Sequence, residues 1–268
     1  MKGIIFTSLL AASVSVTAQA ETYTFGIVPQ QSASRLASQW GPILTRLSLE
    51  TGHNIEFATA ADIPTFEENL RQGKYDFSYM NPYHYAVFSE ASGYRALAKA
   101  KDKQIKGIIV VKKDSGITSI EQLNGQALAF PSPAAFAASI LTRSDLQSAK
   151  VNFTPYYVSS HDSVYLSVAK GFYSAGGGIL RTFNSLPEET RQQLTPIWST
   201  KGYTPHAVAA HASVPENISQ QIQQALVTLT DDPKSNVALS NLKIKAFTPA
   251  QDSDWDDVRN LNISLLEQ

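Results

Sequence analysis

Short apolar runs alternate with longer amphipathic segments along most of the chain. The first run, 23–28, is rich in β-branched and aromatic residues and stops at Pro29, which is typical of a strand. The next segment has apolar residues at helical spacing from Leu36 to Leu47 and stops at Gly52, which predicts a helix with a glycine C-cap. The alternation continues with strands at 54–59, 75–79, 126–130 and 151–158 and helices at 63–72, 134–142 and 162–170. This order predicts an α/β fold with mainly parallel sheets.

Two polar breaks interrupt this alternation. Residues 99–106 are polar and charged and precede the apolar run 107–111, and residues 199–202 follow an apolar piece that ends at Trp198. Because about a hundred residues lie between the breaks, we expect an inserted domain that two crossing segments connect to the rest of the chain. A single continuous sheet with two ordinary loops is the alternative.

The first twenty residues have the composition of an export signal. Lys2 gives a positive start, residues 4–16 are apolar or small apart from hydroxyl residues, and residues 18–20 read Ala-Gln-Ala, which is a small-x-small cleavage signature. The apolar run is shorter than the roughly 20 residues that span a bilayer. We therefore expect a signal peptide at 1–20, cleaved after Ala20, and a periplasmic protein; a retained amphipathic anchor is the alternative.

Charge and cysteine content narrow the function classes. The chain has 22 Lys+Arg and 23 Asp+Glu, a formal net charge of −1, and no cysteine. A near-neutral chain has no bulk attraction to nucleic acid or to an anionic membrane, so neither is an expected partner. The missing cysteines exclude thiol catalysis, disulfides, thiolate metal ligands and a lipid anchor on cysteine. The histidines lack a metal-ligand spacing, so no metal or other cofactor is expected.

Polar side chains cluster in four loops that follow predicted strands. Ligands of open α/β sheets bind beyond the carboxyl ends of the strands, where the free N–H groups of helix starts attract oxyanions. The candidate ligand-binding residues are Gln30, Gln31, Asn81, Tyr83, Ser132, Ala134, Ala135, Ser160, His161 and Asp162. Ser132 and Ser160 also fit the simpler role of helix caps. Arg35 and Arg181 are the cations near these loops in the sequence.

His161 is the most specific of these candidates. An imidazole at a strand-to-helix turn can donate a hydrogen bond to an anion while a carboxylate such as Asp162 holds the ring. A structural or solvent-facing histidine is the alternative interpretation.

Motifs of catalysis are weak in this sequence. Residues 167–170 match the S-x-x-K of penicillin-binding enzymes, but the K-T-G partner is missing and Lys170 simply complements a helix end. The triplet 176–178 is all glycine, which favours a tight turn or a close backbone approach over a dinucleotide fingerprint. We therefore expect a binding protein rather than an enzyme.

Several runs together resemble the phosphate/phosphite/phosphonate ABC-transporter substrate-binding proteins. The resemblance rests on 25–32 with Trp40, 107–111 with 113–115, 123–125, 160–162 and 198–200. It implies a two-lobe periplasmic binding protein of type II, in which each lobe is a mixed, mainly parallel sheet flanked by helices, with lobe one at 21–104 plus 204–268 and lobe two at 105–203. It also implies a small oxyanion held between the lobes and delivered to an ABC permease. A membrane sensor kinase is the alternative partner, and we expect a monomer.

The resemblance assigns one residue and leaves two positions unmatched. His161, in the turn 160–162, matches the family's ligand-contacting histidine. The Ser-Thr-Ser run of phosphonate binders reads Pro-Ala-Ala at 133–135 here, which leaves backbone N–H groups of Ala134 and Ala135 as donors. The family's acidic residue after the histidine helix corresponds to Ser174. An aminoalkylphosphonate is therefore disfavoured, and a simpler oxyanion is expected.

Overall fold

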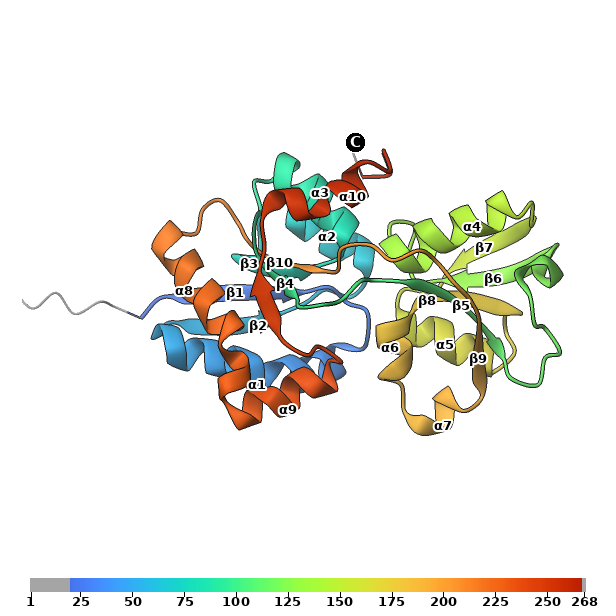
Figure 1. The fold of residues 1–268 in the computed structure, drawn as a ribbon, viewed down its shortest axis with the longest axis horizontal. Coiled ribbons are helices and arrows are strands. Elements are labelled where there is room, and N and C mark those ends of the chain that lie inside the picture. Colours follow the sequence, from blue (N-terminus) through green and yellow to red (C-terminus); the bar gives the residue numbers. More distant parts are fainter. Residues whose placement is uncertain (1–19, 267–268) are drawn as a thin grey trace, which may run out of the picture.

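Two α/β lobes lie side by side in the computed structural model, which describes residues 20–266 (Figure 1). Lobe one contains a six-stranded sheet in the order β11-β4-β10-β3-β1-β2, and lobe two a five-stranded sheet in the order β7-β6-β8-β5-β9. The expected two-lobe α/β fold is confirmed. The expected signal peptide lies outside the described residues except for Ala20.

Lobe one is built from the two ends of the chain. Its strands are β1 (Thr22–Ile27), β2 (Asn54–Ala58), β3 (Phe77–Met80), β4 (Arg95–Ala100), β10 (Ala207–Ala210) and β11 (Phe247–Pro249). Its helices are α1 (Ala33–Thr51), α2 (Ile63–Arg71), α3 (Pro82–Ala91), α8 (Glu216–Val227), α9 (Pro233–Asn241) and α10 (Asp256–Arg259).

Lobe two is formed by the middle of the chain. Its strands are β5 (Gly107–Lys112), β6 (Gln126–Phe130), β7 (Phe153–Tyr157), β8 (Ala175–Ile179) and β9 (Leu194–Ser199). Its helices are α4 (Thr142–Ser148), α5 (His161–Ala169), α6 (Leu180–Asn184) and α7 (Glu188–Arg191), and a π-helical turn at Phe136–Leu141 runs directly into α4.

The sheets are mixed, as expected, but parallel pairs are not the majority, which corrects one detail of the prediction. Among the described residues, four strand pairs are parallel and five are antiparallel. The antiparallel pairs involve β4, β5, β9, β10 and β11, which flank or follow the two crossings between lobes. Local alternation of strand and helix predicts parallel neighbours, whereas a chain that leaves a sheet and returns from another lobe can enter it in either direction.

Helix α1 shows how closely local signals determine an element. Ser32 caps its start, because the Ser32 side-chain oxygen accepts a hydrogen bond from the Arg35 amide at 3.4 Å. The apolar stripe predicted from the sequence is the buried face of the helix, from Leu36 to Leu47. The helix ends at Gly52, whose φ of 70° lies in the left-handed region that favours glycine.

The core of lobe two has two layers because strand β5 is buried on both faces. Ile109 and Val111 pack with Leu128 on one face of the sheet. Ile108 and Val110 pack with α5 on the other face. A strand covered on both sides is a continuous apolar run rather than an alternating one, as residues 107–111 are.

Two chain segments cross between the lobes, at 101–106 and 200–206. They are joined by two backbone hydrogen bonds between Ile105 and Tyr203, of 2.8 and 3.0 Å. The domain boundaries expected from the sequence fall inside or next to these segments, and they stay a prediction. Short paired crossings of this kind allow two lobes to hinge against each other.

The C-terminal segment anchors the second crossing to lobe one. The Thr204 amide donates to the Asp257 carboxylate at 2.8 Å, and the Thr204 hydroxyl donates to the Asp254 carbonyl at 2.7 Å. The Trp255 indole donates to the Pro205 carbonyl at 2.9 Å. One end of the hinge is therefore fixed to the part of the chain that follows β11.

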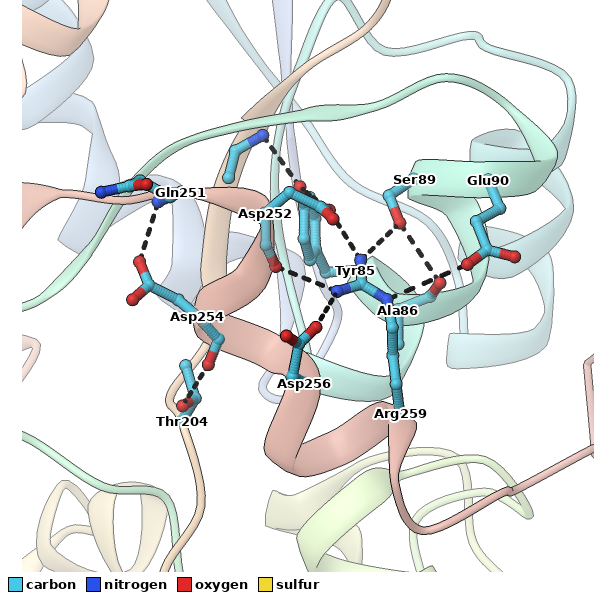
Figure 2. A network of polar contacts seen from close by, with 11 residues as sticks. Tyr85, Ala86, Ser89, Glu90, Thr204, Gln251, Asp252, Asp254, Asp256 and Arg259 are labelled. Carbon is cyan, nitrogen blue, oxygen red and sulfur yellow. Dashed lines mark hydrogen bonds and ion pairs between the residues drawn. The ribbon is translucent and has the colours of Figure 1, made fainter.

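A polar network in turn holds this segment to α3 (Figure 2). The Arg259 guanidinium donates to the Asp252 carboxylate at 2.6 Å, to Asp256 at 3.0 Å and to the Ser89 hydroxyl at 3.1 Å. Asp252 also accepts from the Tyr85 hydroxyl at 2.8 Å. Burial, together with the Asp252 carboxylate, raises the pKa of Tyr85 above its ordinary value, so the phenol stays a donor.

In residues 20–266, helices long and apolar enough to cross a membrane are absent.

Candidate functional site

A small cavity lies between the lobes where the predicted polar loops meet. Its volume is about 10 Å³, which is the space of about one water molecule. Lobe one and the crossings contribute Val28, Gln30, Ile63, Asn81, Ile105 and His206 to its wall, and lobe two contributes Ala135, Phe136, Ala137, Ala138, His161 and Ile179. Of the predicted site residues, the structure brings Gln30, Asn81, Ala135 and His161 to this wall.

Gln30 is the centre of the polar contacts around the cavity. Its backbone carbonyl accepts from the His161 amide, the first N–H of α5, at 3.0 Å. Its side-chain oxygen accepts from the Arg181 guanidinium, and its side-chain nitrogen lies 3.0 Å from His206 Nε2. Because an amide nitrogen can only donate, His206 Nε2 is assigned as an acceptor and the ring as neutral. Gln30 therefore occupies donors from lobe two that could otherwise face a ligand.

His161 is buried, and a threonine rather than a carboxylate holds its ring. Its Nδ1 lies 3.3 Å from the Thr182 hydroxyl, which lies 2.9 Å from the Tyr165 hydroxyl. Asp162, the expected partner, instead forms an ion pair with Arg35 at 3.6 Å. The expectation that Asp162 holds the ring is wrong, because consecutive residues at a helix start point in different directions.

The environment of His161 keeps the ring uncharged. Burial, and then the nearby Arg181 charge, lowers the pKa of His161 from 6.5 to about 3. The same two causes, with His161 and His84 adding to them, lower the pKa of His206 well below its ordinary value. At neutral pH both rings offer neutral N–H donors and nitrogen acceptors to the cavity.

Acid is expected to destabilise the ligand-free protein through His161. The unfolded chain takes up a proton near pH 6.5 and the folded one only near pH 3, so this stabilisation is complete above pH 6.5 and is lost progressively below it. The loss from His161 alone should reach about 2 kcal/mol at pH 5. Urea unfolding at pH 7 and pH 5 measures it. His161→Gln should show a smaller difference between the two pH values, and an unchanged difference would contradict the assignment.

The helical segment that begins at Phe136 packs closely on strands β5 and β8, because a glycine in each strand leaves room for its backbone. A Cβ on Gly107 of β5 would collide with the Ala137 carbonyl oxygen, and a Cβ on Gly177 of β8 with the Ala138 carbonyl oxygen. The glycine triplet is therefore a site of close backbone approach within strand β8, and the alternative of a tight turn is wrong. π-helical turns occur frequently at functional sites.

Two further predicted residues make contacts between the lobes. The Asn81 side chain caps α3 by accepting from the His84 amide at 2.8 Å, and it donates to the Ala134 carbonyl at 3.3 Å. The Arg35–Asp162 ion pair also joins lobe one to lobe two. Burial raises the pKa of Asp162, while Arg35 and then Gln31 act in the opposite direction. Together with the two hydrogen bonds that Gln30 accepts from His161 and Arg181, these contacts show that the two lobes are closed against each other.

The remaining predicted residues lie behind the cavity wall or away from it. Ser160 caps α5 by accepting from the Ser163 amide at 3.1 Å. Ser132 is buried, and its hydroxyl has no hydrogen-bond partner among the described residues. Gln31 is also buried. The structure does not bring Tyr83 to the cavity, because its hydroxyl accepts from the Leu266 amide at 2.9 Å on the outer side of α3.

Two residues, His206 and Arg181, have side chains that contact Gln30 but were not predicted as ligand contacts. His206 ends the second crossing, stacked on Tyr79 with ring centroids 4.9 Å apart. The Arg181 guanidinium lies 5.9 Å from the Tyr79 ring centroid. Arg181 is the second residue of α6, which follows β8 directly, and its place after a strand was the signal that could have identified it. His206 carries no comparable sequence signal, because its position depends on the hinge.

Ser174, the nearest position to the family's acidic residue, lies away from the cavity. It precedes β8 and donates to the Gln126 side chain at 2.8 Å, while the cavity lies at Ile179, the other end of that strand. The cavity wall nevertheless contains no carboxylate among the described residues. Groups of three or more histidine and acidic side chains that could hold a metal ion are also absent from residues 20–266.

Two lobes closed over a cavity with polar side chains in its wall, joined by a paired hinge, define the class of two-lobe solute-binding proteins. The sequence model of the family described as "ABC transporter, phosphonate, periplasmic substrate-binding protein" matches residues 25–255. The chain belongs to this family, and it is a periplasmic substrate-binding protein of an ABC transporter. The family description supports the import role over the sensor alternative.

Individual proteins are similar to the chain at low identity. The phosphate-import protein PhnD of Mycolicibacterium smegmatis is 21% identical over 279 residues, which cover 90% of this chain and 85% of that protein. The tetrathionate sensor histidine kinase TtrS of Salmonella typhimurium is 26% identical over 132 residues, 46% of this chain and 22% of that protein. The methylphosphonate complex of PhnD1 from Prochlorococcus marinus has a TM-score of 0.81 at 17% identity, covering 90% of this chain and 98% of that one.

Proposed function

We propose that this protein captures a small phosphate-, phosphite- or alkylphosphonate-like oxyanion between its lobes and delivers it to an inner-membrane ABC permease. The observation that carries the proposal is the Arg181 guanidinium, which donates to the cavity residue Gln30 and lines the larger depression that adjoins the interlobe cavity. It contacts the neutral Gln30 side chain and the Tyr79 ring. No carboxylate lies within 4.0 Å of it among residues 20–266.

An uncompensated cation in this position favours an anionic ligand. Removing a charge from water is costly unless a partner of opposite charge replaces the lost hydration. Arg181 is only partly exposed, and its guanidinium geometry matches the oxygens of a phosphate or phosphonate group. A bound oxyanion would supply the counter-charge that the protein itself does not.

The other donors of the proposed site are neutral. The first N–H groups of α5 and of the helical segment that begins at Phe136 face the interlobe region. Such groups have no partner within their own helix and carry partial positive charge. His161 adds a neutral imidazole, and Ser132 adds a buried hydroxyl without a partner among the described residues. Helix ends of this kind bind oxyanions without formal charge.

Ligand uptake requires the lobes to open. A cavity of about 10 Å³ holds about one water, so an anion with several heavy atoms does not fit in the closed form. Opening would separate Gln30 from both His161 and Arg181, because Gln30 belongs to lobe one and the other two to lobe two. The anion would then replace Gln30 on these donors and favour reclosure around itself.

The cavity wall indicates which anions are accepted. A ligand amine would lack a charge partner, since the described wall contains no carboxylate. The alanines at 134 and 135 leave only backbone donors where the phosphonate binders that the sequence resembles have hydroxyls. One similar protein is a phosphate-import protein, and one similar structure contains methylphosphonate. Both fit an oxyanion with no substituent or a small apolar one.

We further propose that residues 1–20 direct export and are removed, that the mature protein diffuses as a monomer, and that it performs no catalysis. The partial similarity to a sensor kinase favours one second candidate, in which the closed form signals to a membrane kinase. Growth of a deletion strain on the ligand as the only phosphorus source separates the two roles. If the deletion strain cannot grow even when the permease genes are expressed constitutively, the result supports import. If it grows under that condition and fails only to induce those genes, the result supports sensing.

A calorimetric and thermal-unfolding screen tests the ligand class. Phosphate, phosphite, methylphosphonate, sulfate and aminoethylphosphonate are compared at equal concentration and ionic strength. At least one of the first three should stabilise the fold, by about 2.7 kcal/mol at a hundred times its Kd. Aminoethylphosphonate should bind more weakly than methylphosphonate, because its amine has no carboxylate to pair with. If no oxyanion in the set shifts the unfolding midpoint, the proposed ligand class is wrong.

A further inference from the structure

A second, larger depression lies beside the crossings, and we call it the hinge groove. Its volume is about 840 Å³. Both crossing segments, the end of β4, the start of α6 and the loop before β11 contribute to it. Its charged lining residues are Lys99, Lys101, Asp102, Lys103, Lys106, Arg181 and Lys243.

The charge of the hinge groove contrasts with the rest of the chain. The whole sequence carries 22 Lys+Arg and 23 Asp+Glu, whereas this groove has six cationic side chains and one carboxylate. Segregation of one sign in a concave surface focuses the electrostatic potential there. The local field of the hinge groove is therefore positive although the chain as a whole is slightly negative.

Most of these cations have no counter-charge in the protein. Lys99 is paired with Asp254 at 2.6 Å. For the amines of Lys101, Lys103, Lys106 and Lys243, no carboxylate in the described part of the chain lies within 4.0 Å. Their mutual repulsion is unrelieved by the fold, and a multiply charged anion would relieve it at several points at once.

The hinge groove borders the interlobe cavity but has its own charged residues. The two share Ile105, Ile179 and His206 as a common wall. None of the lysines lines the interlobe cavity. Lys101, Lys103 and Lys106 belong to the first crossing and Lys243 to lobe one, while Arg181 and Asn184 reach the groove from lobe two. An anion that contacts both sides would favour the lobe angle that holds them together.

We propose that the hinge groove is a second anion site, which binds a compact chain of linked phosphates such as inorganic tripolyphosphate or the triphosphate of a nucleotide. The four unpaired lysines come from two parts of the chain, the first crossing and the loop before β11, so an anion with several linked phosphates can pair with more of them than a single phosphate can. A chain of linked phosphates carries several negative charges over a length that suits a groove of this size. This assignment does not depend on which anion the interlobe cavity takes.

Isothermal titration with tripolyphosphate and with ATP, each at 150 mM NaCl, tests the proposal. Salt at this level screens interactions between separated surface charges, so weak general attraction does not imitate a site. The triple variant K101Q/K103Q/K243Q should weaken tripolyphosphate binding about tenfold or more, since each lost exposed contact contributes modestly. The charge-matched control K113Q/K170Q/K234Q changes three exposed lysines elsewhere and should leave the affinity within about twofold of that of the wild type.

The outcomes separate the possible sources of binding. Similar affinity for tripolyphosphate and ATP supports recognition of the phosphates alone, and tighter binding of ATP supports additional contacts to the nucleoside; both require the loss in the first triple variant. Equal weakening in the two triple variants would show a general charge effect and overturn the proposal. Binding that survives the groove triple but is lost in His161→Ala would place the anion in the interlobe cavity, which His161 lines and the hinge groove does not include, and would also overturn it. Absence of binding to either compound at millimolar concentration overturns it directly.

Discussion

Arg181→Ala is expected to weaken the binding of the phosphate- or phosphonate-class ligand about 100-fold, or about 2.7 kcal/mol. The guanidinium donates to Gln30 and lies over the Tyr79 ring at the proposed site. Removing it leaves the anion with neutral donors only. Charge-assisted hydrogen bonds in partly buried sites contribute more than neutral ones. Calorimetric Kd values for wild type and variant, measured with the best ligand of the screen, give the effect.

Three further variants separate the ligand contact from other roles of Arg181. Arg181→Lys keeps the charge without the planar fork and should give an intermediate loss. Arg143→Ala removes the same charge from α4 of the same lobe, where Arg143 donates to the Tyr157 hydroxyl, and should change the affinity little. Gln30→Ala removes the contact between the lobes but keeps the cation, so its loss should be smaller than that of Arg181→Ala. An Arg181→Ala affinity within threefold of wild type would refute the assignment.

Gly177→Ala is expected to destabilise the fold by about 3 kcal/mol and to weaken ligand binding as well. The added Cβ would collide with the Ala138 carbonyl oxygen and with the Phe130 ring. A backbone carbonyl cannot rotate away as a flexible side chain can, so the helical segment that begins at Phe136 has to shift. Because the start of that segment forms part of the cavity wall, the shift should misplace backbone donors. Urea unfolding and calorimetry measure the two effects.

The neighbouring Ser174→Ala is the matched control for this substitution. Ser174 lies just before the same strand, at the end away from the cavity, and its hydroxyl donates to Gln126 near the surface. Its loss should cost about 1 kcal/mol or less and leave ligand affinity unchanged. If Gly177→Ala were as stable as Ser174→Ala, the proposed close approach of the helix to β8 would not be a constraint on this fold.

The elements near the N-terminus of each lobe were predictable because their signals are local. Helix α1 has its cap, its apolar stripe and its terminal glycine in one continuous segment. Strand β5 is a short apolar run, which is the pattern of a strand buried on both faces. The antiparallel neighbours of β4 and β10 were not predictable in this way, because pairs such as Ala98 and Val208 are far apart in the sequence. Local periodicity contains no information on which distant strand becomes a neighbour.

For the candidate site too, the predictions succeeded where the signal was local and failed where it depended on distant residues. Gln30, Asn81, Ala135 and His161 were predicted because they follow strands, and the structure places them at one cavity. Tyr83 shares a loop with Asn81, but its side chain points to the outer side of α3. For both lobes, residues adjacent in the sequence at a helix start separate onto different faces. A loop therefore predicts the location of a site better than it predicts each contact.

By itself, the sequence determined that α/β units place helix starts and neutral donors after several strands, and that no bulk charge or thiol chemistry is involved. These properties depend on residue type and short-range spacing, which are independent of the distant parts of the chain. Only the tertiary structure decided that Thr182 holds His161, and that His206 reaches the cavity wall. It also decided that Arg181 donates to the cavity residue Gln30, with no carboxylate within 4.0 Å of its guanidinium among residues 20–266. Each of these contacts joins residues brought together by lobe closure or by packing within a lobe. Burial and the neighbouring Arg181 charge, which together keep His161 neutral, exist only once the chain has folded.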